Sequence, residues 1–518
     1  MKQLGYQFLA LLGLVSISSV YVTGLFNNKL FQTHENQAYL EQQRLLQQSN
    51  RPADSFFDVD LDHFVTNGAS STFKLRYLID ESNVKGNDAP ILFYCGNEAE
   101  ITIFWDNLGY VTDFLAHQMN AVVLFGEHRY YGSSKPMGDD SFKPENVKFL
   151  TVEQVMMDYV KLIKSIKSQD KYKNSAVIAF GGSYGGMLAS WIRMKYPHII
   201  QGAHAASAPI LFFPGAVSPY AFNELVTRTY RDVIPGFDCS SVVKKGLQLL
   251  NSYQADKTHY QDIKNAFNTC DGQPSSSDQV QFLLDSIPSV LGNMAMVNYP
   301  YPTSFIAPLP GNPVKAACTA AGVPASDLDY INSLAKMYLV FTNYSGQSIC
   351  TNLNGGNQQF APPDTQAWDY QTCQEFVTPI FQSGKTDMFL PEPYNPDLII
   401  SDCAKKGLIP QFDYNLDTFG GRNINKDFAH ISNIIFSNGD LDPWRAGGIP
   451  EGTLKDNKDI LIRLIKGGAH LLDLRAPNKD DPQDLTDART SFTALIQKWV
   501  SDYADLIKAS QKETLFIQ

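Results

Sequence analysis

Residues 175–197 contain the feature that most restricts the fold of this chain, a strand–turn–helix pattern around Ser183. The apolar run from Ala176 to Phe180 is short and dense enough to be a buried parallel strand. A glycine-rich turn, Gly181-Gly182-Ser183-Tyr184-Gly185-Gly186, comes next, and apolar residues then recur at helical spacing until Pro197. A G-x-S-x-G turn between a strand and a helix is typical of a nucleophile elbow.

The turn has the chemistry that a nucleophilic serine requires. Gly181 and Gly185 leave room for the strand and the helix to pass closely, and glycine tolerates strained backbone angles. The Tyr184 N–H, at the start of the helix, would point at a developing oxyanion. We therefore expect Ser183 to be a catalytic nucleophile, whereas the simpler interpretation is an incidental serine in a glycine-rich turn.

The length and composition restrict the class of protein. With 518 residues, the chain is long enough for two domains, or for one large domain with an insertion. A hydrophobic content of 44% with 18% charged residues is typical of a globular protein. The formal net charge is −11 and no basic patch occurs, so nucleic acid is not an expected partner.

The cysteines indicate an oxidising compartment. Six of the seven lie between residues 239 and 403, and no C-x-x-C pair is present. This distribution favours disulfides in one region of a secreted or luminal protein over a zinc site. Six cysteines allow 15 pairings, among which the sequence does not choose, and Cys95 would be left as a buried thiol.

The N-terminus resembles a targeting segment. Residues 1–24 contain a positively charged start and an apolar stretch that ends in small residues, which predicts a secretory signal peptide. The alternative is an uncleaved membrane anchor. If the signal peptide is cleaved, no stable membrane association is expected. Residues 25–50 are predicted to be a leader or propeptide.

Residues 51–210 are predicted to form the first part of an α/β domain. Strand patterns are found at 73–79, 91–95, 121–125 and 204–209, and an amphipathic helix pattern covers 152–167. Strands that alternate with helices predict a parallel sheet with helices on both faces.

Residues 211–425 are predicted to be an inserted helical cap, because strand patterns become rare there and cysteines appear. This region contains the N-glycosylation sequon at Asn343. Residues 426–518 are predicted to complete the α/β domain, with strands at 431–436 and 460–465 and a closing helix at 490–506.

A catalytic acid and base can be placed at later strand ends. In α/β-hydrolases the triad follows the order Ser, Asp, His. Either Asp440 or Asp442 could be the acid, and His470, in a Gly-Gly-Ala-His loop, could be the base. Pro443 favours an extended Asp442, which gives that residue only a small advantage.

Other polar residues lie at the ends of earlier strands. Gly96 and Asn97 are the natural source of a second oxyanion-hole donor. Glu98 and the run Glu127-His128-Arg129 either line the pocket or form structural ion pairs, and we favour the structural interpretation. No metal, phosphate-loop or dinucleotide motif occurs, so no metal or cofactor is expected.

With these motifs located, the sequence resembles the lysosomal Pro-Xaa carboxypeptidase and dipeptidyl peptidase II family of serine exopeptidases. The matching segments span roughly residues 56 to 500 in the same order as in the family. They include Leu61-Asp62-His63-Phe64, Tyr94-Cys95-Gly96-Asn97-Glu98, Glu127-His128-Arg129-Tyr130-Tyr131-Gly132, Gly181-Gly182-Ser183-Tyr184-Gly185-Gly186, Tyr299-Pro300-Tyr301-Pro302, Leu441-Asp442-Pro443-Trp444 and Gly468-Ala469-His470.

The resemblance implies an α/β-hydrolase fold with an inserted, mostly helical cap. It assigns the triad as Ser183, Asp442 and His470, and it places Met187 and Trp444 at an apolar pocket for proline. It implies no cofactor. It also implies three disulfide pairs, namely Cys239 with Cys318, Cys270 with Cys350, and Cys373 with Cys403.

The chain departs from the family pattern at a few positions. Cys95 stands where Thr is usual, and Leu471 follows the catalytic histidine where a second His is common. Arg445 and Ala446 also differ from the usual residues after Trp444. These changes could alter the pH dependence or the leaving-group pocket without removing the chemistry.

The resemblance predicts a lysosomal or secreted enzyme that cleaves after proline in peptides, and a homodimer is compatible with it. The two branches of the family hold opposite ends of the peptide, and the loop with Asn97 and Glu98 is expected to contribute to that choice. We favour a Pro-Xaa carboxypeptidase, with a dipeptidyl peptidase as the alternative. An esterase or lipase, and an inactive hydrolase-fold binding protein, are more remote alternatives.

Overall fold

The structure is a computed structural model that describes residues 51–346, 348–354, 363–454 and 457–517. The predicted signal peptide (1–24) and leader (25–50) lie outside the described residues. No helix in these ranges is both long and apolar enough to span a lipid bilayer.

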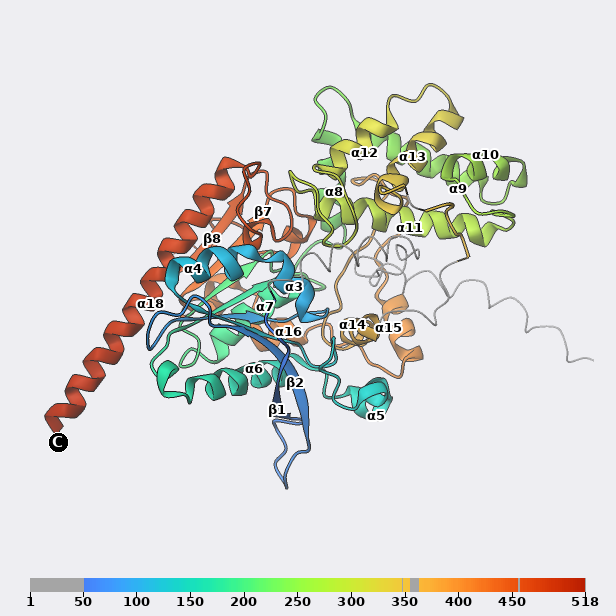
Figure 1. The fold of residues 1–518 in the computed structure, drawn as a ribbon. Helices are drawn as coiled ribbons and strands as arrows, with labels where there is room; N and C mark the ends of the chain where they lie inside the picture. The colour runs from blue at the N-terminus through green and yellow to red at the C-terminus, as the bar shows by residue number, and fades with distance from the viewer. Residues whose placement is uncertain (1–50, 347, 355–362, 455–456, 518) are drawn as a thin grey trace, which may run out of the picture.

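Eight strands form one central sheet in the order β1-β2-β4-β3-β5-β6-β7-β8 (Figure 1). All neighbours from β4 to β8 are parallel, whereas β2 is antiparallel to both β1 and β4. The strands are β1 (Ser55–Asp60), β2 (Thr72–Asp80), β3 (Ile91–Cys95), β4 (Val122–Gly126), β5 (Val177–Gly182), β6 (Gly202–Ala206), β7 (Ile434–Gly439) and β8 (Ile460–Ile465).

The predicted parallel sheet is present from β4 to β8, whereas the N-terminal edge of the sheet is antiparallel. The connection between β1 and β2 is too short for the crossover that parallel neighbours need, so these two strands pair as a hairpin. β6 also ends at Ala206, before the predicted end, because Ser207 has a φ of 48° and leaves the extended conformation.

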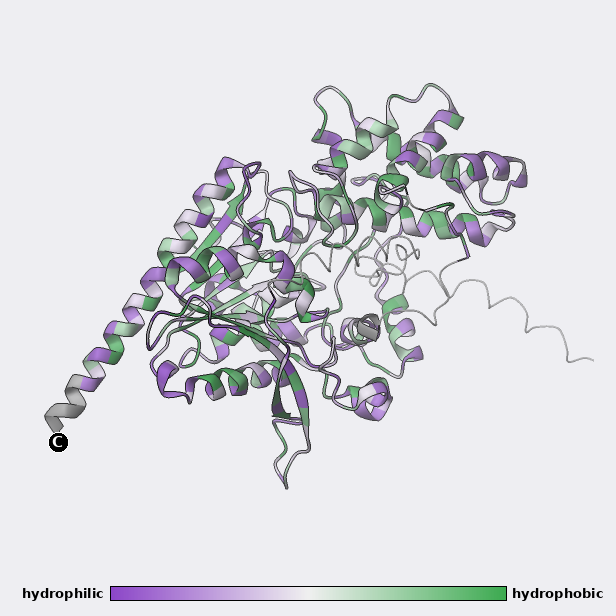
Figure 2. Cartoon of the chain, in the orientation of Figure 1, coloured by the Kyte–Doolittle hydropathy of each residue, from purple (hydrophilic) through white to green (hydrophobic). Residues whose placement is uncertain are grey.

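Helices cover both faces of the sheet. Side chains that alternate along β3 separate the two cores, with Leu92 and Tyr94 on one face and Ile91 and Phe93 on the other. The first face packs against α3 (Ile101–Asn107) and the long α18 (Gln483–Ile517). The second packs against α6 (Val152–Lys167), which has its predicted bounds, and against α7 (Tyr184–Lys195). Apolar residues concentrate in the sheet, while the outer helices contain both apolar residues, in green, and polar residues, in purple (Figure 2).

The chain between β6 and β7 is mainly helical, so the fold is that of an α/β-hydrolase with an inserted helical cap. Its helices are α8 (Ala221–Asp232), α9 (Cys239–Tyr253), α10 (Tyr260–Phe267), α11 (Ser277–Met296), α12 (Pro313–Ala321), α13 (Asp327–Thr342), α14 (Pro363–Gln374), α15 (Pro396–Lys405), α16 (Tyr414–Phe419) and α17 (Ile424–Asp427).

The inserted helices form two groups (Figure 1). Helices α8 to α13 lie together, and the disulfides Cys239–Cys318 and Cys270–Cys350 link parts of this group. Helices α14 to α16 lie beside the sheet domain. There, Phe419 stacks on Trp191 of α7 with ring centroids 4.2 Å apart. The third disulfide, Cys373–Cys403, belongs to this second group. The three pairs are those that the resemblance implies, and the cap bounds 211–425 stay a prediction.

Candidate active site

Ser183 occupies a strained turn between β5 and α7. Its backbone angles are φ 58° and ψ −126°, a conformation that non-glycine residues rarely adopt and that is typically found at functional sites. A β-carbon on Gly181 would lie 1.8 Å from the carbonyl oxygen of Gly185, so only glycine fits there. The Ser183 N–H donates to the Ala206 carbonyl at 2.9 Å, which fixes the turn to the end of β6.

His470 and Asp442 form a buried acid–base pair. His470 Nδ1 lies 2.8 Å from Asp442 Oδ2, and both side chains are almost inaccessible to solvent. The other carboxylate oxygen, Oδ1, accepts the Trp444 N–H at 2.9 Å. Because the carboxylate only accepts, Nδ1 carries the proton and Nε2 can act as a base. Among the described residues, Nε2 has no hydrogen-bond partner.

Asp440, the second aspartate that the sequence left open, has different contacts. Its Oδ1 accepts the Gly467 N–H at 2.7 Å, and its own N–H donates to the Ile465 carbonyl at 2.9 Å. These bonds join the ends of β7 and β8. Of the two aspartates, Asp442 is therefore the one that lies against His470.

The cap holds the backbone of His470 on both sides. The His470 N–H donates to the carbonyl of Met296, the last residue of α11, at 2.9 Å. The hydroxyl of Tyr299 donates to the His470 carbonyl at 2.7 Å. Sequence reasoning missed both contacts, although Tyr299 belongs to a Tyr-Pro-Tyr-Pro segment that supported the resemblance.

The loop after His470 lies directly against the elbow. A β-carbon on Gly182 would lie 2.5 Å from Cδ2 of Leu471, so the two segments meet at van der Waals distance only because residue 182 is glycine. The Leu471 N–H also donates to Ser207 Oγ at 3.0 Å. The carboxyl ends of β5, β6 and β8 thus bring the serine turn and the histidine loop together.

The three candidate oxyanion-hole residues differ in the hydrogen bonds that their backbone groups already make. Tyr184 begins α7, so its N–H belongs to the first turn, whose donors have no partner within the helix. Gly96 is fully engaged: its N–H donates to Gly126 at 3.0 Å and its carbonyl accepts the Tyr159 hydroxyl at 2.7 Å. Asn97 is buried against the elbow, because a β-carbon on Gly185 would lie 3.1 Å from its Oδ1. We therefore favour the N–H of Asn97 over that of Gly96.

The side chain of Tyr184 is locked by a polar network. Its hydroxyl lies 2.8 Å from His128 Nε2 and accepts a hydrogen bond from the amide of Gln371, in α14, at 3.1 Å. His128 Nδ1 must donate to the Arg129 carbonyl, 2.7 Å away, so Nε2 is the acceptor for the tyrosine. Burial lowers the pKa of His128 to about 4, which keeps this ring neutral in mildly acidic solution.

Met187 and Trp444, the residues expected at a proline pocket, are both buried near the candidate triad. Met187 lies in the first turn of α7, and its N–H donates to the Ser183 carbonyl at 3.1 Å. The Trp444 ring lies 6.4 Å from the ring of His470 and contacts Phe222 edge-on at 5.1 Å. Trp444 therefore provides apolar surface close to the histidine, and Met187 provides it in the first helical turn after Ser183.

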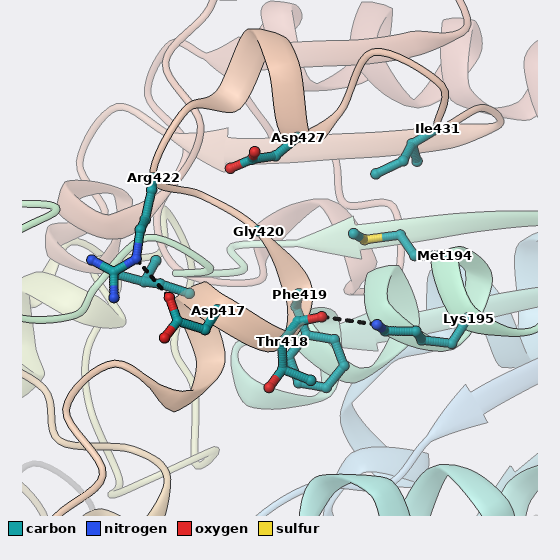
Figure 3. A pocket seen from close by; sticks show the side chains of 10 residues that line it. Met194, Lys195, Asp417, Thr418, Phe419, Gly420, Arg422, Asp427 and Ile431 are labelled. Carbon is teal, nitrogen blue, oxygen red and sulfur yellow. Dashed lines mark hydrogen bonds and ion pairs between the residues drawn. The ribbon is translucent and has the colours of Figure 1, made fainter.

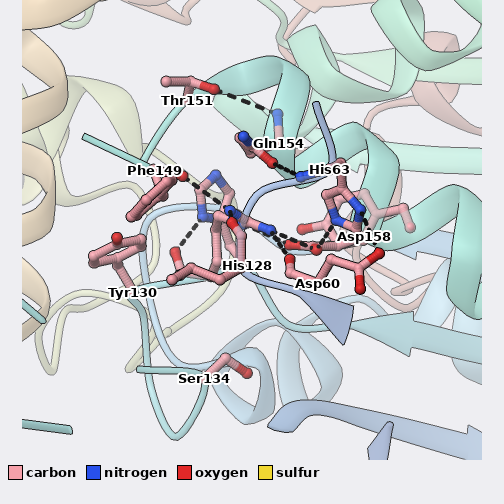
Figure 4. A network of polar contacts seen from close by, with 12 residues as sticks. Asp60, His63, His128, Tyr130, Ser134, Phe149, Thr151, Gln154 and Asp158 are labelled. Atoms are coloured by element: carbon pink, nitrogen blue, oxygen red, sulfur yellow. Dashed lines mark hydrogen bonds and ion pairs between the residues drawn. The ribbon is translucent and has the colours of Figure 1, made fainter. Parts of the chain in front are cut away.

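Two of the charged residues at strand ends form structural ion pairs, as the sequence favoured. Glu127 pairs with Arg76 at 2.7 Å. Arg129 contacts both oxygens of Asp158 at 2.7 Å, and Asp158 also accepts from His63 at 2.6 Å (Figure 4). This network joins the start of the sheet domain to α6.

A second set of Ser, His and Asp residues lies buried beneath the histidine loop. His204 Nε2 is 3.0 Å from Asp473 Oδ2, and Ser437 Oγ donates to the same oxygen at 2.5 Å. Burial acts to raise the pKa of Asp473, but hydrogen bonds from His204 and Ser437 together with the charge of His204 outweigh it and hold this pKa below its ordinary value. Sequence reasoning missed this set.

A surface pocket of about 480 Å³ is separate from these groups (Figure 3). Met194 and Lys195 contribute to it, so it lies at the C-terminal end of α7, whereas Ser183 precedes the N-terminal end. None of the predicted site residues lines it. In the part of the chain that the structure describes, no group of three or more side chains is placed to hold a metal ion.

Comparisons with known proteins show the family to which the chain belongs. Residues 59–492 match the family model described as serine carboxypeptidase S28. Human lysosomal Pro-X carboxypeptidase is 39% identical over 87% of this chain and 88% of its own length. The Caenorhabditis elegans "prolyl carboxy peptidase like protein 5" is 34% identical over 83% of this chain and 87% of its own. A solved Mycobacterium smegmatis proline iminopeptidase aligns over 87% of this chain and 98% of its own, with 11% identity and a TM-score of 0.38.

Proposed function

Because the chain belongs to the serine carboxypeptidase S28 family and is therefore a serine peptidase, we propose that it removes the C-terminal residue that follows a proline. Ser183 is the proposed nucleophile, His470 the base and Asp442 the orienting acid. The observation that carries this proposal is the buried 2.8 Å contact between His470 and Asp442, beside a strained serine turn.

The proposed reaction proceeds in two acyl-transfer steps. His470 Nε2 takes the proton of Ser183 Oγ as the oxygen attacks the carbonyl carbon of the proline residue. The N–H groups of Tyr184 and Asn97 stabilise the negative oxygen that develops. His470 then gives its proton to the leaving amine. Water hydrolyses the acyl-enzyme by the same route in reverse, with Asp442 stabilising the imidazolium each time.

Proline specificity is proposed to come from the apolar surface of Met187 and Trp444. A proline ring offers a rigid apolar shape and no backbone N–H, so a pocket can recognise it only by shape and apolar contact. Both side chains are buried and contain no charged group. The names of the curated relatives, which include lysosomal Pro-X carboxypeptidases, support the same substrate class and a lysosomal or secreted location.

Cleavage of two peptides by the purified protein tests this function. One peptide has a blocked N-terminus and a free C-terminal residue after proline, and the other has a free N-terminal Xaa-Pro unit that carries a reporter. Turnover of the first peptide alone is expected. Turnover of the second alone would identify a dipeptidyl peptidase, and turnover of neither peptide would favour another acyl substrate.

A further inference from the structure

Three acidic side chains gather near the end of β3, and one of them differs from the other two. Arg76 pairs with Glu100 at 3.0 Å and with Glu127 at 2.7 Å. Within the described ranges, no lysine or arginine forms an ion pair with Glu98. Its Oε2 instead accepts a hydrogen bond from the Asn97 side-chain amide at 2.9 Å. Glu98 is therefore a half-buried carboxyl group that has no lysine or arginine partner among the described residues.

The position of Glu98 links it to the reacting groups. It directly follows Asn97, which lies against the serine elbow. The titratable groups that interact with its charge include His470, Tyr94 and Tyr184. Burial raises the pKa of Glu98 to about 7, although hydrogen bonds and the charge of His470 act in the opposite direction. In mildly acidic solution the Glu98 carboxyl is therefore mainly in its neutral, protonated form.

Glu98 lies beside Asn97 at the serine elbow and within reach of the charge of His470, so it lies near the part of a substrate that His470 serves. His470 delivers its proton to the departing nitrogen, so the leaving group must lie beside it. In a carboxypeptidase the leaving group is a single amino acid, whose carboxylate carbon is two bonds from that nitrogen. A dipeptidyl substrate would place its free ammonium on the other, acyl side of the scissile bond.

We propose that Glu98, as a neutral carboxylic acid supported by Asn97, donates a hydrogen bond to the free C-terminal carboxylate of the peptide. This inference rests on the proposed function and names the group that selects the C-terminal end of the substrate. A neutral carboxyl has an O–H to donate, whereas an ionised one only accepts and repels a second carboxylate. Recognition therefore weakens as Glu98 ionises.

The test compares an N-blocked peptide that ends in proline and one further residue with the same peptide as its C-terminal amide. The ratio of their kcat/KM values is measured from pH 5 to pH 8. Ionisation of His470 affects both peptides alike and cancels in the ratio. For the wild-type enzyme, the ratio should fall by about tenfold to a hundredfold across this range, as expected when a hydrogen bond to a charged group is lost.

Glu98→Gln keeps a neutral donor at every pH, so its ratio should stay nearly constant. Glu392→Gln is the matched control. Burial also raises the pKa of Glu392 to about 7, but this residue lines a cavity in the cap that includes none of the proposed catalytic groups. Its ratio should follow that of the wild type.

A wild-type ratio that does not change with pH would overturn the proposal, and this measurement needs no folded variant. A Glu98→Gln ratio that still falls as in the wild type would also overturn it. Loss of Xaa-Pro reporter cleavage in Glu98→Gln would identify an amine anchor instead and would contradict the proposal. If the wild-type enzyme cleaves neither form of the blocked peptide, the proposed function itself fails, and the inference fails with it.

Discussion

Two buried aspartate–histidine pairs lie close together in this protein, and their surroundings differ. Asp442 and His470 meet at 2.8 Å, and Asp473 and His204 meet at 3.0 Å. Each histidine has one ring nitrogen without a hydrogen-bond partner among the described residues. The loop that bears His470 lies against the serine elbow. His204 is enclosed by aromatic rings, with the ring of Phe492 4.9 Å away and that of Phe180 6.0 Å away.

The serine of the second set is also arranged differently. Ser437 donates to Asp473, the acid, and lies 2.9 Å from the same histidine nitrogen that contacts this acid. No chain of proton transfer from serine through histidine to acid can form in that arrangement. The same three residue types therefore serve as an internal brace that holds the loop after His470 against β6 and β7. Composition alone does not define a catalytic triad.

Removal of the two serine hydroxyls should separate the two sets most strongly. Ser183→Ala is expected to lower kcat by about 10⁴-fold to 10⁶-fold while leaving the melting temperature unchanged, because it removes only the nucleophile. Ser437→Ala should keep kcat within a few-fold. Peptide-cleavage kinetics with a thermal-unfolding control check both. Comparable losses of kcat in the two variants would contradict the distinction.

Replacement of the two aspartates should affect different properties. Asp442→Asn is expected to lower kcat by about 10⁴-fold, because the histidine loses the acceptor that fixes its tautomer. Asp473→Asn should lower the free energy of unfolding by about 3 kcal/mol, because it leaves half of a buried pair. Its folded fraction should retain most of its activity. Denaturant unfolding and active-site-normalised kinetics measure the two effects, and a stable but inactive Asp473→Asn would refute this assignment.

Loss of one cap contact should have a smaller effect. Tyr299→Phe removes the hydroxyl that donates to the His470 carbonyl. The expected cost is about 1 kcal/mol, the usual net value of one such bond. It should appear as a decrease in kcat of less than tenfold with an unchanged KM. A change in KM alone would show that Tyr299 contacts the substrate rather than positioning the histidine.

The pH dependence of stability should distinguish Asp473, in the internal brace, from the buried glutamates whose pKa is raised. Asp473 has a lowered pKa, so its contribution is complete above pH 3.8 and is lost as the pH falls through its folded value. Burial raises the pKa of Glu127 to about 6 and that of Glu392 to about 7. These two groups stabilise the folded protein below their unfolded pKa, near 4.5, and that contribution is lost as the pH rises towards 7.

We therefore expect the highest melting temperature near pH 5, with a decrease on both sides. The difference between the wild type and Asp473→Asn should shrink below pH 4, and Glu392→Gln should reduce the decrease between pH 5 and pH 7.5. Thermal-unfolding curves from pH 3 to pH 8 give both results. A melting temperature that rises steadily to pH 8 would contradict the signs of these shifts.

Much of the fold and of the candidate site could be predicted because the signals are local. The elbow, the Asp-Pro-Trp segment and the Gly-Ala-His loop each follow a strand pattern, so their order along the chain was enough to place them at one sheet edge. The strands at 91–95 and 460–465 and the helix at 152–167 have their predicted bounds. Periodicity within one segment is sufficient for such elements.

The remaining features depend on contacts between distant segments. The brace combines Ser437 and Asp473 with His204, from more than two hundred residues earlier, and none of the three belongs to a motif. Met296 and Tyr299 contact His470, although His470 lies about 170 residues later in the chain. The antiparallel β1 edge depends on pairing rather than on periodicity. Such long-range contacts leave no pattern in a single sequence.

The most direct test of the account is to locate the adduct after reaction of the native enzyme with a fluorophosphonate. Peptide mapping by mass spectrometry should find a single modified serine, Ser183, with parallel loss of peptide cleavage. The label should be absent from the Ser183→Ala and His470→Ala variants. Modification at Ser437, or complete inactivation without modification of Ser183, would contradict the assignment of the nucleophile.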